Sequence, residues 1–134
     1  RREVDLAHAA EGVGRFRVNV FRQLGDIAMA LRYIPDRVFT LEELGAPPAI
    51  AADLALRPRG LVLLTGPTGS GKSTTLTAMV DIINNTRPVH VVTIEDPIEF
   101  HHTSNKALIH QREVGSDTES FAEALRRVLR QDPT

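Results

Sequence analysis

The first third of the chain carries the alternation of polar and apolar residues that is typical of β-strands. Residues 15–20, Arg-Phe-Arg-Val-Asn-Val, change between polar and apolar at every position. Successive strand residues point to opposite faces, so this segment has one face suited to burial and one suited to water. The turn signal Glu11-Gly12-Val13-Gly14 precedes it. Residues 4–10 are therefore predicted to be its hairpin partner, and residues 27–34 a third strand that ends before Pro35.

Short helices are predicted in the middle of the chain. Thr40 is a good N-cap for a helix over residues 41–44, and Glu43 follows it by three positions, as a capping box requires. The pair Pro47-Pro48 begins a second short helix over residues 49–56, because proline is favoured in the first turn.

The pattern changes after residue 58. Residues 61–65, Leu-Val-Leu-Leu-Thr, form a continuous apolar run, which is typical of a parallel strand covered on both faces. A glycine-rich turn follows, and then a helix predicted from about Lys72 to Ile83. Residues 90–94 and 106–111 are predicted to be two more strands.

The last apolar pattern is helical. Residues 119–130 have apolar side chains at helical spacing, which predicts an amphipathic helix capped by Asp117 or Thr118. The order strand, helix, strand, strand, helix begins an α/β sheet domain. We therefore predict an α/β protein with a first domain over residues 1–45, a linker over 46–58 and a second domain over 59–134.

Composition narrows the classes of function. The 134 residues include 42% hydrophobic and 25% charged residues, ordinary values for a globular protein. The net charge of −1 gives no reason to expect a nucleic-acid partner or a membrane-binding face. The chain has no cysteine, which excludes disulfides and thiolate metal sites. No apolar run approaches the roughly 18 residues of a membrane span, and we predict no metal site among the histidines.

Residues 66–73 match the phosphate-binding loop G-x-x-x-x-G-K-[ST] at every fixed position. The alternative interpretation is a plain glycine turn. The fixed residues of the motif would occur by chance in only about 0.5% of chains of this length, which disfavours that alternative. Glycines let successive N–H groups point at an anion, and the following helix adds its positive end. The loop predicts binding of MgATP, with Lys72 on the β and γ phosphates, Ser73 on Mg²⁺ and Thr74 near the α-phosphate. The candidate nucleotide-binding residues are Gly66, Pro67, Thr68, Gly69, Ser70, Gly71, Lys72, Ser73 and Thr74.

Three carboxylates, Glu95, Asp96 and Glu99, follow the strand predicted at residues 90–94. Ligands of open α/β sheets bind outside the carboxyl ends of the strands, where the phosphate loop also opens. An ATPase needs a group that positions or activates water near the γ-phosphate, and carboxylates around its Mg²⁺. The alternative is a solvated acidic turn, and the chemistry favours the functional interpretation.

Together these motifs resemble the secretion ATPases of the type II/type IV pilus superfamily. The resemblance rests on residues 66–76, on Thr93-Ile94-Glu95-Asp96-Pro97-Ile98-Glu99 and on residues 111–118, Gln-Arg-Glu-Val-Gly-Ser-Asp-Thr. The last run is similar to the retraction ATPases of twitching motility. Residues 121–126, 129–133, 14–19 and 32–35 extend the resemblance over nearly the whole chain.

The resemblance implies a fold and an incomplete site. Residues 1–45 would be part of a β-rich, PAS-like N-terminal domain, and residues 59–134 the first half of a RecA-like ATPase domain. The chain does not begin with Met, and its end follows directly on a helical pattern, so we expect both ends to be cuts through a longer protein. The Walker B carboxylate would then lie beyond residue 134.

The resemblance also implies roles for single residues. Glu99 would be the general base, while Glu95 and Asp96 would complete the acidic box near the metal and phosphates. Asp96 would join Ser73 as a candidate metal-binding residue. Arginines of the N-terminal domain and linker would reach the phosphates, and the matching positions are Arg17, Arg32 and Arg59.

Members of the superfamily form homo-hexamers. The resemblance therefore implies a cytoplasmic motor subunit that hydrolyses ATP to power pilus retraction and that is held at the inner membrane by a platform protein of the pilus. Two alternatives stay open. One is a pilus-extension or type II secretion ATPase, and the other is a fragment that binds nucleotide without turnover.

Overall fold

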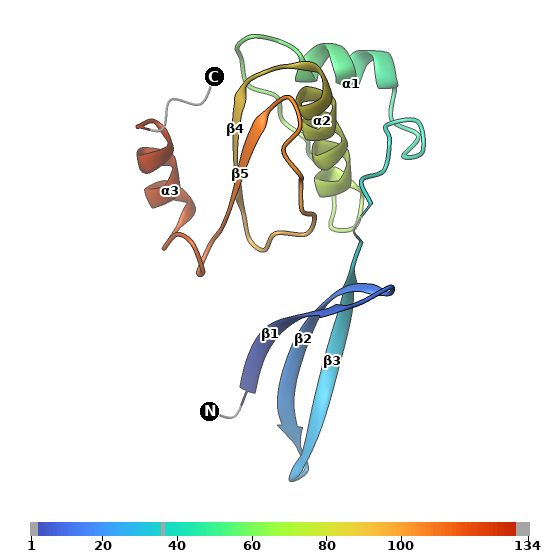
Figure 1. Cartoon of the computed structure of the whole chain (residues 1–134), viewed down its shortest axis with the longest axis vertical. Coiled ribbons are helices and arrows are strands. Elements are labelled where there is room, and N and C mark those ends of the chain that lie inside the picture. Colours follow the sequence, from blue (N-terminus) through green and yellow to red (C-terminus); the bar gives the residue numbers. More distant parts are fainter. Residues whose placement is uncertain (1–2, 36, 131–134) are drawn as a thin grey trace. The chain divides into compact units, whose positions relative to one another are not determined.

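Antiparallel strands make up most of the first unit of the chain. The computed structural model describes residues 3–35 and 37–130, and the chain separates into the units Arg1–Arg37 and Val38–Thr134. In the first unit a single sheet has the order β1 (Glu3–Ala10), β2 (Gly14–Gln23), β3 (Asp26–Ile34) (Figure 1). The predicted hairpin and third strand are confirmed.

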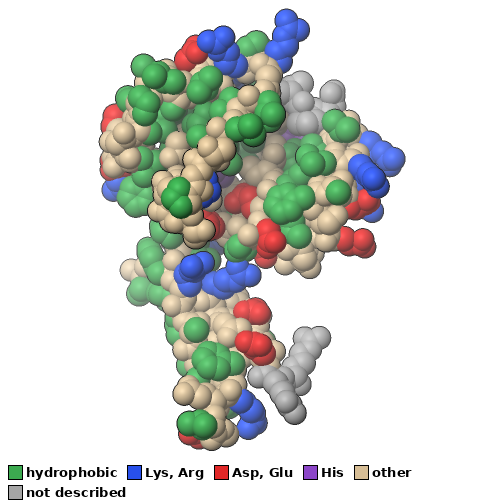
Figure 2. Space-filling model, turned by 180° about the vertical axis from the view of Figure 1, so that it is seen from behind, with side chains coloured by type: hydrophobic (Ala, Val, Ile, Leu, Met, Phe, Trp, Pro, Cys, Tyr) green, Lys and Arg blue, Asp and Glu red, His purple; other side chains and the backbone are tan. Residues whose placement is uncertain are grey.

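The alternating pattern of β2 separates an apolar face of the sheet from a more polar one. Val18 lies between Leu6 of β1 and Leu31 of β3 and is 5% exposed. Arg17 lies on the opposite face, directly across from Arg32 of β3. Figure 2 shows that hydrophobic side chains also reach the surface of this unit, in agreement with the exposure of Leu6 and Leu31.

The second unit combines helices with a parallel pair of strands. Its elements are α1 (Pro48–Ala55), α2 (Lys72–Thr86), β4 (His90–Glu95), β5 (Leu108–Glu113) and α3 (Phe121–Val128). Strands β4 and β5 pair in parallel. The predicted α/β class is confirmed. Among the described residues, none of the helices has the length and apolar character of a membrane-spanning segment.

Two apolar clusters hold α2 in the second unit. One joins it to α1 and the other joins it to the start of β5. The first contains Leu41, Ala51, Ala78 and Met79, and the second contains Val80, Ala107 and Ile109. Because Leu41 packs in this unit, the division between units falls earlier than the predicted linker. The two domains predicted over residues 1–45 and 59–134, with a linker over 46–58, are domains of the family, and their bounds remain predictions.

The helix predicted over residues 41–44 is a turn. Its capping box does form, because the Thr40 N–H donates to the Glu43 carboxylate at 2.8 Å and the Glu43 N–H donates to the Thr40 hydroxyl at 3.3 Å. Gly45 then has a φ of 67°, in the left-handed region where helices end. The cap was read correctly, and the chain leaves the helical path after one turn.

The strand predicted over residues 61–65 is not a strand. No segment in the described part of the chain pairs with it, and Leu61 and Leu63 are 84% and 73% exposed. A strand is stable only when its N–H and C=O groups bond to a neighbour. The composition of the apolar run suits a strand, but no neighbouring strand among the described residues pairs with it.

The ends of two helices differ from the prediction. Helix α2 continues beyond Ile83 and ends at Thr86, because Arg87, the residue before Pro88, is pushed out of the helical region. Helix α3 is capped by Ser120, whose hydroxyl accepts from the Glu123 N–H at 3.2 Å. Asp117 and Thr118 are therefore not its cap. The predicted strand over 106–111 is shifted to 108–113, and residues 131–133 of the family resemblance lie outside the described residues.

Candidate functional site

The loop from Gly66 to Ser73 leads into the first turn of α2, as predicted. Gly71 is the residue before the helix, with a φ of 86°, and no side chain caps the helix there. The first N–H groups of α2 are thus without a side-chain acceptor, which is how a helix start receives an anion. A side chain at Gly66 would place its Cβ 2.7 Å from the Ser70 hydroxyl oxygen, and its φ of 154° is also strained for other residues.

Lys72 folds back over the start of this loop. Its ammonium donates to the carbonyl oxygen of Gly66 at 2.9 Å and to that of Pro67 at 2.7 Å. A lysine ammonium has three donors, so a third remains for a further acceptor. The loop is thereby closed on its own lysine, with the charge held at the start of α2.

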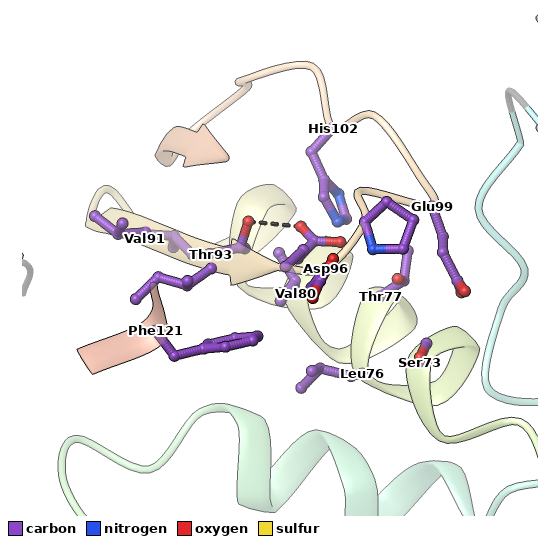
Figure 3. Close-up of a pocket in the computed structure, with 14 residues that line it drawn as sticks. Ser73, Leu76, Thr77, Val80, Val91, Thr93, Asp96, Glu99, His102 and Phe121 are labelled. Atoms are coloured by element: carbon purple, nitrogen blue, oxygen red, sulfur yellow. Dashed lines mark hydrogen bonds between the residues drawn. The ribbon is translucent and has the colours of Figure 1, made fainter. Parts of the chain in front are cut away.

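A cavity of about 440 Å³ adjoins the start of α2 (Figure 3). Ser73 and Thr77 of α2 line it, together with Glu95 at the end of β4 and with Asp96 and Glu99 just after the strand. The remaining lining is mostly apolar and comes from α2, β4, α3 and the segment between β4 and β5. The whole lining is Ser73, Leu76, Thr77, Val80, Val91, Val92, Thr93, Ile94, Glu95, Asp96, Pro97, Glu99, His102 and Phe121.

The structure brings some of the predicted site residues together and leaves others apart. Ser73, Glu95, Asp96 and Glu99 share the cavity, whereas Lys72, Thr74 and the rest of the phosphate loop do not line it. Arg59 lies in an irregular, exposed segment before the apolar run. Arg17 and Arg32 lie in the first unit.

The three carboxylates of the cavity differ in their surroundings. One oxygen of Glu95 accepts from the Thr93 hydroxyl at 2.6 Å (Figure 3). The same oxygen accepts from the Gln111 amide at 3.2 Å. Asp96 and Glu99 are exposed. Glu95 is thus held against the sheet by two neighbours, while Asp96 and Glu99 present their carboxylates to solvent at the cavity.

His102 is a cavity residue that the sequence did not single out. It lies in the irregular segment that follows β4. Burial lowers the pKa of His102, against the opposing effects of Asp81 and Glu95. Its Nδ1 is buried and has no hydrogen-bond partner in the structure. The ring therefore favours the neutral form and forms part of the cavity wall.

His90 of β4 and His110 of β5 contact each other across the two parallel strands. Their ring nitrogens Nε2 and Nδ1 lie 3.0 Å apart. The parallel register places Val92 beside His110, so His90 and His110 are diagonal neighbours on one face. Within residues 3–35 and 37–130, no group of three or more His, Asp or Glu side chains is arranged to hold a metal ion.

The comparison with known families decides the identity. A family model described as "Type II/IV secretion system protein" matches residues 6–134. The chain belongs to this family. The superfamily resemblance read from the phosphate loop and the acidic residues is therefore confirmed, while the roles of the single site residues remain predictions.

Individual relatives show which members of the family the chain is similar to. The chain is 55% identical to the type IV pilus retraction ATPase PilT of Pseudomonas aeruginosa, over 98% of this chain and 38% of that protein. It is 56% identical to a twitching motility protein of Neisseria gonorrhoeae, over 98% of this chain and 35% of that protein. The crystal structure of the pilus retraction motor PilT with bound ADP matches with a TM-score of 0.91 and 51% identity, over 99% of this chain and 38% of that one.

The chain therefore spans less than two fifths of the length of these relatives.

Gln111, which belongs to the run that is similar to retraction ATPases, was not assigned a role from the sequence. In the structure its amide nitrogen donates to the Glu95 carboxylate and to the Phe100 carbonyl. The only sequence signal for Gln111 was its place in this motif, and the motif gave no chemical reason for a glutamine there.

Proposed function

We propose that this chain is the nucleotide-binding part of an ATP-hydrolysing motor subunit that powers type IV pilus retraction. The observation that carries the proposal is the phosphate loop closed by Lys72 at the start of α2, next to a cavity lined by Ser73 and three carboxylates. Identity of 55–56% to a pilus retraction ATPase and a twitching motility protein, over 98% of the chain, supports retraction as the work that hydrolysis drives.

The proposed nucleotide contacts follow from the loop. The N–H groups of the loop and of the first turn of α2 bind the phosphates, and Lys72 adds its charge at the β and γ phosphates. Phosphoryl transfer depends mainly on positioning and charge stabilisation, which such a loop supplies. ATP and ADP are therefore the proposed ligands of residues 66–74.

The residues of the cavity also fit Mg²⁺. This ion prefers oxygen ligands, keeps several waters and takes only one or two protein ligands in nucleotide sites. The Ser73 hydroxyl and the Asp96 carboxylate line the same cavity and supply such oxygens. When bound, the ion would neutralise charge on the β and γ phosphates.

Glu99 is the proposed general base. Its carboxylate is exposed and lines the cavity that Ser73 shares, so it has access to a water molecule beside the γ-phosphate. In Figure 3 its side chain extends away from the ring of His102. Glu95, which Thr93 and Gln111 hold in place, is proposed to shape the wall of the cavity.

Arginines complete the proposed site. Arg17 and Arg32 lie directly opposite each other on neighbouring strands, and like charges in that position destabilise a sheet. Binding of an anion would offset this repulsion. We propose that these two, with Arg59, contact nucleotide phosphates in a homo-hexamer and so couple domain movement to turnover.

We propose that the subunit acts at the cytoplasmic face of the inner membrane, where a platform protein of the pilus holds it.

The test of the proposed function replaces Lys72 with alanine in the chromosomal gene of the bacterium that carries it. We expect abundant surface pili and no twitching, because pili would extend without being withdrawn. Protein level is checked by immunoblot, and the exposed Lys106→Ala variant is the control. Loss of surface pili would contradict retraction and indicate extension.

A further inference from the structure

A loop without regular structure carries two of the site's three carboxylates, Asp96 and Glu99. This acidic loop, residues 96–107, connects β4 to β5. An exposed loop of this kind moves unless its backbone groups are bonded. Hydrolysis requires the base to stay within hydrogen-bond reach of the attacking water. Whatever holds the acidic loop therefore controls the position of Glu99.

Gln111 of β5 bonds to the acidic loop with both ends of its side-chain amide. Its nitrogen donates to the Phe100 carbonyl at 2.7 Å, and its oxygen accepts from the His102 N–H at 2.8 Å. The same nitrogen donates to Glu95 at 3.2 Å. A backbone carbonyl can only accept and a backbone N–H can only donate, so these two partners fix the orientation of the amide.

Glu113, two residues further along β5, holds the other side of Glu99. One of its carboxylate oxygens accepts from the Ile98 N–H at 2.9 Å, and the other accepts from the Ser116 hydroxyl at 3.2 Å. Its own N–H donates to the Asp117 carboxylate at 2.8 Å. Glu113 is therefore itself anchored in the turn that follows β5.

The two anchors enclose Glu99 in the sequence. Glu113 bonds to residue 98 and Gln111 bonds to residue 100. The side chain of Phe100 is only 8% exposed, so it adds a packed contact at the same point. Alternate positions of a strand share a face, and the parallel register sets Gln111 beside Thr93 and Glu113 beside Glu95. Both anchors thus reach the loop from the face that carries Glu95.

We propose that Gln111, supported by Glu113, is a positioning residue that sets Glu99 for attack of water on the bound nucleotide. This inference rests on the proposed ATPase function. Gln111 acts through the backbone on either side of Glu99 and lines no part of the cavity. Its loss should therefore reduce the rate of the chemical step without weakening nucleotide binding. A displacement of about 1 Å at a reacting group lowers a rate by about 100-fold.

The test is Gln111→Met in the full-length protein, because methionine has a similar length and neither donor nor acceptor of comparable strength. We expect kcat for ATP to fall about 10- to 100-fold, with MgATP affinity within about 2-fold of wild type. Hydrogen exchange at the His102 N–H group, which donates to Gln111, should become faster. Gln23→Met, at an exposed glutamine of β2, is the matched control and should change neither quantity.

Two further variants separate the possible failures. An active wild type, an inactive Lys72→Ala variant and a Gln111→Met variant with unchanged kcat would overturn the positioning role and leave the ATPase function standing. A wild type without ATPase activity would overturn both. Should Gln111→Met fail to fold, Gln111→Glu keeps the acceptor for His102 and removes the donor to Phe100. Unchanged kcat in Gln111→Glu would also overturn the inference, as would an equal loss of affinity and kcat.

Discussion

Replacing Glu99 with glutamine is expected to lower ATP turnover by the full-length protein about 100- to 10,000-fold, the usual contribution of a general base. Glutamine has nearly the same size but cannot accept a proton at neutral pH. Glu99 is exposed at the cavity, and within the described part of the chain no hydrogen bond or ion pair ties its side chain into the fold. MgATP affinity should therefore stay within about 2-fold of wild type, because the loop and Lys72 that bind the phosphates are unchanged.

The measurement is steady-state phosphate release beside equilibrium binding of MgATP. Glu42→Gln is the matched control, since Glu42 is exposed in the turn after Thr40 and does not line the cavity. The control should keep both wild-type turnover and affinity. A Glu99→Gln variant that retains wild-type turnover would show that another group activates the water.

Replacing Lys72 with alanine is expected to weaken MgATP binding about 10- to 100-fold. A hydrogen bond to a charged group contributes about 1.5–3 kcal/mol, and each 1.4 kcal/mol is about tenfold in affinity. Lys72 also ties the loop to the carbonyls of Gly66 and Pro67 at 2.9 and 2.7 Å. Alanine therefore removes a charge contact and the closure of the loop together.

Fluorescence titration with a labelled ATP analogue measures this loss. The chain's other lysine, Lys106, is exposed and lies outside the cavity, so Lys106→Ala is the matched control. It removes the same charge from the surface and should leave the affinity unchanged. Equal affinity in Lys72→Ala and wild type would exclude the proposed contact of this lysine with the phosphates.

Local patterns in the sequence predicted the elements whose causes are local. The alternation at residues 15–20 predicted β2, and the fixed glycines with Lys72 predicted a loop that does open onto a helix. The capping box of Thr40 formed as predicted. Two helix ends could have been read more closely, because Pro88 stops α2 and the pair Ser120 and Glu123 marks the start of α3.

The remaining features depend on contacts between distant parts of the chain. The apolar run at residues 61–65 indicates a strand but says nothing of whether a neighbour is present to pair with it. The contacts of His90 with His110, and of Gln111 with Glu95, depend on the register of β4 against β5. That register follows from packing over many residues, so the anchors of the acidic loop could not be predicted from the motif that contains them.

The central claim is that residues 66–73 bind the phosphates of a nucleotide, and competition binding tests it most directly. The full-length protein is saturated with a fluorescent MgATP analogue, and unlabelled ATP, ADP and adenosine are then added in separate titrations. We expect ATP and ADP to displace the analogue and adenosine to leave it bound, because the loop's N–H groups and Lys72 contact phosphates. Displacement by adenosine as effective as that by ATP, or no saturable binding at all, would contradict the claim.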